Sequence, residues 1–284
     1  MSISDVFQLA KVRLSLSVVF SAIAGYFIAG GSFSSFSLFY LVLGGFLVVA
    51  CSNGLNQLLE KDLDSLMKRT ENRPLPTRRM KSREALFISL LMGVVGVWLL
   101  FLINQWSGLL GAGSVLLYVL AYTPLKRLSS ISVFVGAFPG AIPFMLGWVA
   151  VTNTFGIEAL ILFAIQFIWQ FPHFWAIAWS SNDDYQRAGF KMMPGPKDRG
   201  TAFKILVYTI FLIPISILPF FGVSNNLSIS LISTLLCVII GLWFLTKAVV
   251  LFKSLKDEDA KKLMIASFIY LPILQLIYVI DKLL

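Results

Sequence analysis

Charged residues are scarce in this sequence. Of the 284 residues, 13% are Asp, Glu, Lys or Arg and 58% are hydrophobic, and the mean hydropathy is +0.85. A soluble domain carries about 25% charged residues, so too little polar surface exists here to cover a water-soluble globule. The composition excludes a soluble protein and predicts an integral membrane protein along the whole chain.

Cysteine and histidine are also rare. Cys51 and Cys237 both fall inside apolar runs, where we expect small packing residues and neither a disulfide nor a covalent haem-attachment motif. His173 is the only histidine. No Arg-rich, acid-poor transit segment is visible, and Asp5 with late basic residues is atypical of a signal peptide. We therefore expect the first apolar run to be a retained helix.

The long apolar runs predict an all-α, polytopic membrane protein with nine transmembrane helices in one domain, residues 1–284. Each spanning helix needs ~20 mainly apolar residues, and the runs lack the alternation of apolar and polar residues that is typical of membrane β-barrels. The expected spans are 14–30, 38–58, 85–103, 108–122, 131–151, 157–180, 203–222, 227–251 and 263–280.

Basic residues are concentrated in every second loop between these spans. Every Lys and Arg except Lys282 falls on one side of the nine spans, and cytoplasmic loops are the ones enriched in these residues. We expect a bacterial cytoplasmic membrane protein with its amino terminus and basic loops in the cytoplasm and its carboxyl terminus outside. Topology and anionic lipid account for most of the net charge of +9 without a nucleic-acid partner.

The second span runs directly into clustered acids and then clustered bases, in NQLLEKDLDSLMKRTENRPLP (56–76). If the helix continues, positions four apart differ by ~40° around its axis, so Asn56, Glu60 and Asp64 share one face. Two carboxylates and an amide oxygen suit magnesium bound with substrate phosphates, and Arg69 and Arg73 can bind phosphate oxygens. A helix that simply ends at the membrane–water interface would explain the basic residues but not the four-residue spacing of Asn56, Glu60 and Asp64.

A second cluster of the same kind ends the sixth span. Asp183 and Asp184 are followed by Arg187 and Lys191. Two facing carboxylate sites could hold two magnesium ions around one diphosphate, because metal ions neutralise the charge of a leaving group.

Two further stretches are candidate parts of the site. YTPLKR (122–127) is either a plain cytoplasmic turn or a segment that also binds diphosphate, through Lys126 and Arg127. PHFW contains His173, and a histidine within a membrane segment is by default a candidate functional residue. Alternatively, the His173 side chain makes only a structural hydrogen bond beside Pro172. Neighbouring aromatics such as Trp175 are candidate cavity walls.

These motifs resemble the UbiA-type membrane prenyltransferase superfamily. The first of its motifs reads here Asn56, Glu60, Asp64, Arg69-Thr70 and Arg73-Pro74. YTPLKR, PHFW and DDYQRAG…MMP narrow the resemblance to its haem branch, the haem O synthases, over almost the whole chain. The sequence departs from the family pattern at Glu60, where many members have Asp, and at Ser180, which stands where the second motif has an Asp four residues before Asp184.

The resemblance implies a helical bundle around a central cavity and transfer of a farnesyl group, with addition of water, from farnesyl diphosphate to protohaem IX (haem b). It implies that magnesium binds at Asn56, Glu60, Asp64 and Asp184, and the second acidic cluster adds Asp183 as a candidate. It implies that Arg69, Arg73 and Lys126 bind the diphosphate with Tyr122 near them, and the charge clusters add Arg127 and Lys191 as candidates. His173 and Trp175 would lie on the haem side, and Lys11 and Arg13 are weaker candidates. A haem-modifying membrane enzyme or oxidase assembly would use the product.

Three alternatives stay open from the sequence. The acceptor could be an aromatic quinone precursor instead of haem. The carboxylates could form the cation site of a membrane transporter, although such sites usually lie near the bilayer midplane. The chain could also be a non-catalytic membrane assembly factor, which would not need paired acids.

Overall fold

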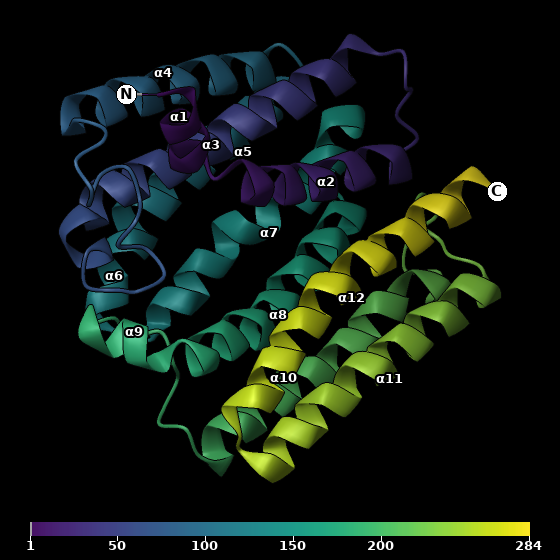
Figure 1. Ribbon diagram of the computed structural model, residues 1–284. Coiled ribbons are helices and arrows are strands. Elements are labelled where there is room, and N and C mark those ends of the chain that lie inside the picture. The colour runs from purple at the N-terminus through teal and green to yellow at the C-terminus, as the bar shows by residue number, and fades with distance from the viewer. Residues whose placement is uncertain (1) are drawn as a thin grey trace.

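The computed structural model describes residues 2–284, and this part of the chain is built from helices (Figure 1). The α-helices are α1 (Ile3–Ala10), α2 (Val12–Ile28), α3 (Phe36–Asp64), α4 (Ser82–Phe101), α5 (Gln105–Leu116), α6 (Thr123–Leu128), α7 (Ile131–Thr152), α8 (Ile157–Ser180), α9 (Asn182–Arg187), α10 (Arg199–Ile217), α11 (Leu231–Ser254) and α12 (Asp257–Leu283). A π-helical turn (Leu117–Tyr122) joins α5 to α6, and a 3₁₀ turn (Leu218–Phe221) follows α10.

The structure confirms the predicted membrane-spanning architecture. Eight segments in the described part of the chain are long and apolar enough to cross a membrane, and the α1–α2 pair, bent by 47°, makes a ninth. Two helices are longer than predicted: α3 continues six residues beyond the predicted end at residue 58 and reaches Asp64, and α12 begins at Asp257, six residues before the predicted start at residue 263. The protein is therefore a multi-pass, all-α membrane protein.

Three short helices were not predicted from the apolar runs. These are α1, α6 and α9, which are polar or too short to give a membrane-span signal. In α1, the Ser2 hydroxyl accepts a hydrogen bond from the Asp5 amide, and the Asp5 carboxylate accepts one from the Ser2 amide. This reciprocal cap satisfies amides that a helix start leaves free.

The spanning helices form a closed ring. Helix α2 packs against α3 and α7, α7 packs against α8, and α12 closes the ring by packing against both α8 and α2. Helix α4 lies outside α3, whereas α5 packs against α4 and α7 and contributes Gly111 and Ser114 to the interior. Helices α10 and α11 cover α8 and α12 (Figure 1). The ring leaves an interior space between its helices, whereas the outer helices face the lipid.

Apolar side chains cover the outside of the molecule. On α4, Phe87 and Val94 are 68% and 70% exposed. Soluble proteins rarely expose such large contiguous apolar surfaces. The largely apolar interior also holds polar groups that have partners, such as Gln275, whose amide is hydrogen-bonded to the Ser21 hydroxyl. This distribution is that of a bundle whose solvent is hydrocarbon.

Helices α2 and α7 cross at a very short distance because glycines lie at their contact. A Cβ atom added to Gly147 would lie 1.9 Å from the Ala22 carbonyl oxygen, and one added to Gly25 would lie 2.1 Å from the Phe144 carbonyl oxygen. Small residues at such crossings let the two backbones approach in a membrane. This contact closes one side of the interior space.

We expect Gly147→Ala to separate α2 from α7 and to destabilise the bundle by roughly 1–3 kcal/mol, the usual cost of overpacking. Thermal unfolding in detergent would measure the change. Gly113→Ala is the matched control, because a Cβ atom there meets nothing within 4 Å. Equal stability of the two variants would contradict the close crossing.

Candidate active site

A cavity of about 460 Å³ lies within the helix ring and has two chemically different ends. Its charged lining consists of Lys11, Glu60, Asp64, Arg69, Arg73 and Lys126. Its other part is lined by apolar and aromatic side chains, among them Trp169, Phe174 and Phe268. The charged end lies where α3 ends and α6 and the 65–81 loop begin.

Helix α3 places the predicted acidic stripe in this cavity. Asn56, Glu60 and Asp64 line it and are buried, with exposed fractions of 2%, 6% and 1%. Asp62 is exposed, as its position on the opposite face predicts. The helix could continue past the apolar run because the stripe finds polar partners inside the protein.

Each buried carboxylate has a cationic partner. Glu60 Oε1 lies 2.6 Å from Lys126 Nζ, and Glu60 Oε2 accepts a hydrogen bond of 2.8 Å from the Asn56 amide. Arg73 Nη1 donates to both carboxylate oxygens of Asp64, at 2.8 and 2.7 Å. An unpaired charge at such a depth would be strongly destabilising, so these pairs stabilise the two buried acids.

A π-helical turn orients the residues opposite α3. After Leu117–Tyr122, the Thr123 hydroxyl accepts a hydrogen bond of 3.2 Å from Asn56 and donates one of 2.8 Å to the Tyr118 carbonyl. The Lys126 ammonium lies 4.8 Å from the centre of the Tyr122 ring. Such turns are frequent at functional sites, and this one brings Tyr122 and Lys126 of YTPLKR to the cavity.

The cavity lining has an excess of positive charge. Four cationic side chains, Lys11, Arg69, Arg73 and Lys126, face two carboxylates, Glu60 and Asp64. Low-dielectric walls strengthen the attraction of this excess for an anion. The charged end therefore suits a multiply charged anion such as a diphosphate.

Asp184 has a different position from the α3 acids. Its carboxylate accepts hydrogen bonds of 3.3 Å from the backbone amides of Lys68 and Arg69, and it pairs with the Arg187 guanidinium. It does not line the cavity, whereas its neighbour Tyr185 does. Asp184 thus joins α9 to the loop that carries the arginines.

Tyr185 and Arg69 form a further link between these segments. The Arg69 guanidinium carbon lies 5.9 Å from the centre of the Tyr185 ring. Burial raises the pKa of the Tyr185 hydroxyl, so the phenol stays protonated and available as a hydrogen-bond donor.

Several predicted residues lie away from the cavity. Asp183, Arg13 and Arg127 are exposed and do not line it. Trp175 is buried between Phe171 and Tyr208, with ring centres 5.3 and 5.2 Å away, so it supports the cavity wall from behind. The structure brings together the other predicted groups at the charged end: the α3 stripe, Arg69, Arg73, Tyr122, Lys126 and Lys11.

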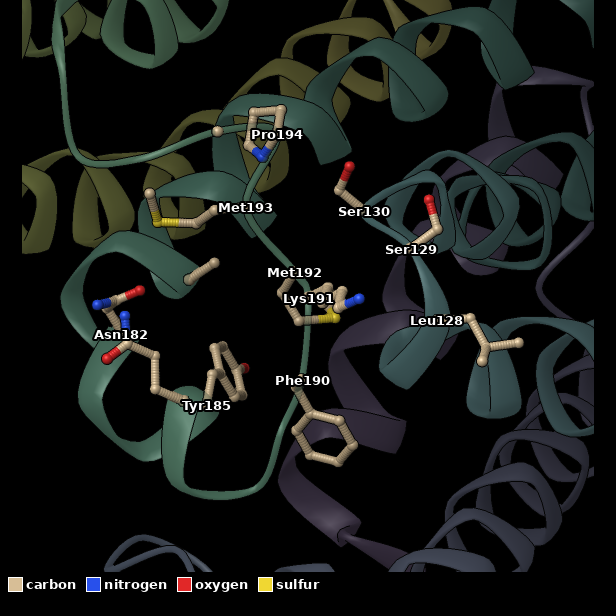
Figure 2. Close-up of a pocket in the computed structure, with 13 residues that line it drawn as sticks. Leu128, Ser129, Ser130, Asn182, Tyr185, Phe190, Lys191, Met192, Met193 and Pro194 are labelled. Atoms are coloured by element: carbon tan, nitrogen blue, oxygen red, sulfur yellow. The ribbon is translucent and has the colours of Figure 1, made fainter.

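Lys191 belongs to a second pocket of about 450 Å³ (Figure 2). The segment Phe190–Pro194 runs through this pocket opposite Ser129 and Ser130 (Figure 2). The Lys191 amide donates a hydrogen bond of 2.7 Å to the Lys126 carbonyl. The backbone of Lys191 therefore supports the lysine that does line the cavity.

Among the cavity-lining residues that sequence reasoning missed are three aromatic side chains beside the charged end, Tyr118, Tyr185 and Phe190. The Lys126 ammonium lies 5.4 Å from the centre of the Phe190 ring. Tyr185 and Phe190 stand inside the DDYQRAGF motif that was noted for its acids, and an aromatic between charged residues was the only available signal.

His173 lines the cavity at its aromatic part. Its ring is stacked on Trp169 with 4.4 Å between centres, and Phe268 approaches it edge-on at 4.7 Å. The histidine is therefore in contact with the interior space and not only with the packing around it.

The α3 stripe has donors that suit magnesium. In residues 2–284, no group of three or more His, Cys, Asp or Glu side chains is placed to hold a metal ion. Two carboxylates and one amide oxygen nevertheless match the hard ligands that Mg²⁺ takes when substrate phosphates supply the remainder. The residues fit a metal that arrives with a phosphorylated substrate.

Comparison with known families gives a match over most of the chain. The profile of the UbiA prenyltransferase family matches residues 18–271. A protein of Flavobacterium psychrophilum named "Protoheme IX farnesyltransferase" is 48% identical over 98% of this chain and 94% of its own length. One of the same name from Christiangramia forsetii is 49% identical, over 99% and 94%.

Solved structures share the fold at low sequence identity. A digeranylgeranylglyceryl phosphate synthase superposes with a TM-score of 0.82 at 18% identity, over 99% of this chain and 98% of its own. A UbiA homologue from Archaeoglobus fulgidus, bound to DMAPP and Mg²⁺, superposes with a TM-score of 0.72 at 14% identity, over 94% and 98%.

We expect Asp184→Ala to loosen the 65–81 loop, because the Lys68 and Arg69 amides lose their carboxylate acceptor. Hydrogen exchange at these two amides should become about tenfold faster, which corresponds to ~1.4 kcal/mol and is typical of a lost hydrogen bond. Asp183→Ala is the matched control, since Asp183 is exposed. Unchanged exchange in Asp184→Ala would show that this carboxylate does not hold the loop.

Proposed function

Because this chain belongs to the UbiA prenyltransferase family, we propose that it transfers the farnesyl group of farnesyl diphosphate to a vinyl group of protohaem IX, with addition of water, to give haem O. One observation carries the proposal: a single cavity joins a cation-rich end to an aromatic, apolar part. The family predicted from the sequence motifs is confirmed, and the haem acceptor is the one in the names of relatives at 47–49% identity.

The diphosphate binds at the charged end. Arg69, Arg73, Lys126 and Lys11 supply positive charge around the space beside α3, and Arg73 can exchange part of its contact with Asp64 for phosphate oxygens in bidentate geometry. Tyr122 and Tyr185 stand beside these cations. The apolar farnesyl chain then extends into the aromatic part of the cavity, where its burial contributes to affinity.

Magnesium would be held by Glu60 and Asp64, with the Asn56 side chain beside them, and when bound it neutralises charge on the departing diphosphate. Homologues of this fold have been solved with Mg²⁺ and the prenyl diphosphates DMAPP and GPP. The cations of the charged end stabilise the same charge through preorganised electrostatics. Asp184 contributes indirectly, by holding the loop that carries Arg69 and Arg73.

The acceptor occupies the aromatic part, near His173. As the bond between farnesyl C1 and the diphosphate oxygen breaks, C1 becomes cationic. Faces of Trp169, Phe174 and Phe268 line this region, and aromatic faces stabilise a nearby cation. The same walls exclude bulk water, which would otherwise trap the cation as farnesol.

The protein acts as a single domain in the bacterial cytoplasmic membrane. The Lys and Arg distribution supports a cytoplasmic position for the charged end of the cavity, which is where a water-soluble diphosphate is available and where it can leave. The product is a more hydrophobic haem, so a haem-modifying membrane enzyme or an oxidase assembly is the class of partner that would take it up.

We expect purified protein in liposomes to convert protohaem to a product heavier by one farnesyl group plus water, in a reaction that a chelator stops. Mass spectrometry of the haem with and without magnesium measures this. Unchanged haem from folded protein that still releases diphosphate with a phenolic acceptor would instead favour the quinone-precursor alternative. Cation flux without diphosphate release would favour transport.

We expect Asp64→Asn and Glu60→Gln each to lower the rate of haem O formation by at least about 100-fold, the scale on which loss of a preorganised charge acts. Asp62→Asn is the matched control: it removes an acid two residues away that is exposed. Thermal unfolding should show all three variants folded. Near-normal rates for Asp64→Asn and Glu60→Gln would remove the magnesium assignment.

A further inference from the structure

The hydrogen bonds of His173 define which of its ring nitrogens carries the proton. Nδ1 lies 2.7 Å from the Ser267 hydroxyl on α12. That hydroxyl also lies 2.6 Å from the Met264 carbonyl oxygen, to which it donates. A serine has one hydroxyl hydrogen, and a carbonyl offers none, so the hydrogen at the Ser267 oxygen points to Met264. His173 must therefore donate from Nδ1, and Nε2 carries the free lone pair.

The orientation of the imidazole is held from several sides. Trp169 stacks on it at 4.4 Å, and the Trp169 indole nitrogen donates a hydrogen bond of 3.0 Å to the Ser267 carbonyl. Ser267 thus anchors both rings, through its hydroxyl and its backbone. Because His173 lines the cavity and its Nδ1 is used, Nε2 is the nitrogen that can act on a molecule in the cavity.

The other bases of the cavity lining are already engaged. Glu60 is paired with Lys126 and Asp64 with Arg73, and in the proposed function both serve the diphosphate. Among the residues that the structure describes, Nε2 of His173 makes no side-chain hydrogen bond, whereas Nδ1 makes one. The aromatic part of the cavity therefore contains one neutral, unpaired nitrogen base.

We propose that Nε2 of His173 accepts the proton of the water that adds to the acceptor, and that Ser267 and Trp169 position it for this step. This inference rests on the proposed function. Proton transfer to a positioned histidine is a frequent device of catalysis, and here the tautomer is preset by the Ser267–Met264 hydrogen bond.

The step balances as follows. The bond between farnesyl C1 and the diphosphate oxygen breaks, and its electron pair leaves with the diphosphate. The vinyl π electrons form a bond from the terminal vinyl carbon to C1, which leaves a cation on the carbon next to the porphyrin ring. A water oxygen bonds to that carbon, and one of its protons moves to Nε2. No oxidant or reductant is needed, and the proton later leaves to solvent.

The first test is His173→Ala, with His173→Gln as a second variant if the alanine variant unfolds. We expect haem O formation to fall by at least about 100-fold, with farnesyl diphosphate affinity unchanged within about twofold. Added imidazole should restore part of the rate in His173→Ala. Without added imidazole, the Soret band of bound protohaem should be the same in His173→Ala as in the wild-type protein. Wild-type turnover confirms the proposed function independently of this result.

Two results would overturn the proposal. Near-wild-type rates in folded His173 variants would exclude a base at this position. A lost rate together with a shifted Soret band would instead identify His173 as a ligand of the haem iron.

The second test separates positioning from packing. Ser267→Ala removes the acceptor for Nδ1, and we expect the rate of haem O formation to fall by about tenfold or more, with a larger share of product that carries farnesyl without water. Ser216→Ala is the matched control, because Ser216 is equally buried and also donates to the carbonyl three residues earlier, that of Ile213. Equal rates and equal product ratios in the two serine variants would contradict the positioning role.

Discussion

A charge inside an apolar bundle must have a partner, and this requirement organises the charged end of the cavity. Water cannot solvate Glu60 and Asp64 at their depth, so Lys126 and Arg73 compensate them. The two pairs join α3 to α6 and to the 65–81 loop. They thereby assemble, before any substrate arrives, the cations that a diphosphate would meet.

The same requirement leaves the charged end with an excess of cations. Four cationic side chains surround two carboxylates, so the pairs satisfy the acids but leave positive charge uncompensated. In the proposed function, a diphosphate that arrives with magnesium would complete the balance, since the metal would add charge for the carboxylates and the phosphates would take up the cations.

Away from the charges, the cavity depends on close packing of the ring. The glycine contact between α2 and α7 brings these helices together, and Pro139 and Pro143 of α7 line the interior. Aromatic side chains of α8 and α12 line the same space. The amphipathic substrate pair of the proposed reaction matches this division between a charged end and an apolar, aromatic part.

Local patterns in the sequence were sufficient for the spans and for the stripe on α3. Hydropathy predicts a membrane helix directly, because the lipid selects apolar residues over ~20 positions. The four-residue spacing of Asn56, Glu60 and Asp64 predicts a shared face, because helical geometry is local. The same reasoning placed Asp62 on the other side, where it is exposed.

Which residues meet across the cavity depended on the tertiary structure. Asp183 and Asp184 are adjacent and chemically identical, yet Asp184 holds the loop amides while Asp183 is exposed. Lys126 lines the cavity while Arg127 does not. Ser267 stands 94 residues from His173, and no local pattern connects them. Composition and periodicity thus determined the membrane helices and the acidic stripe, whereas only the packing of distant helices decided which polar groups became partners, because those contacts depend on how whole helices cross.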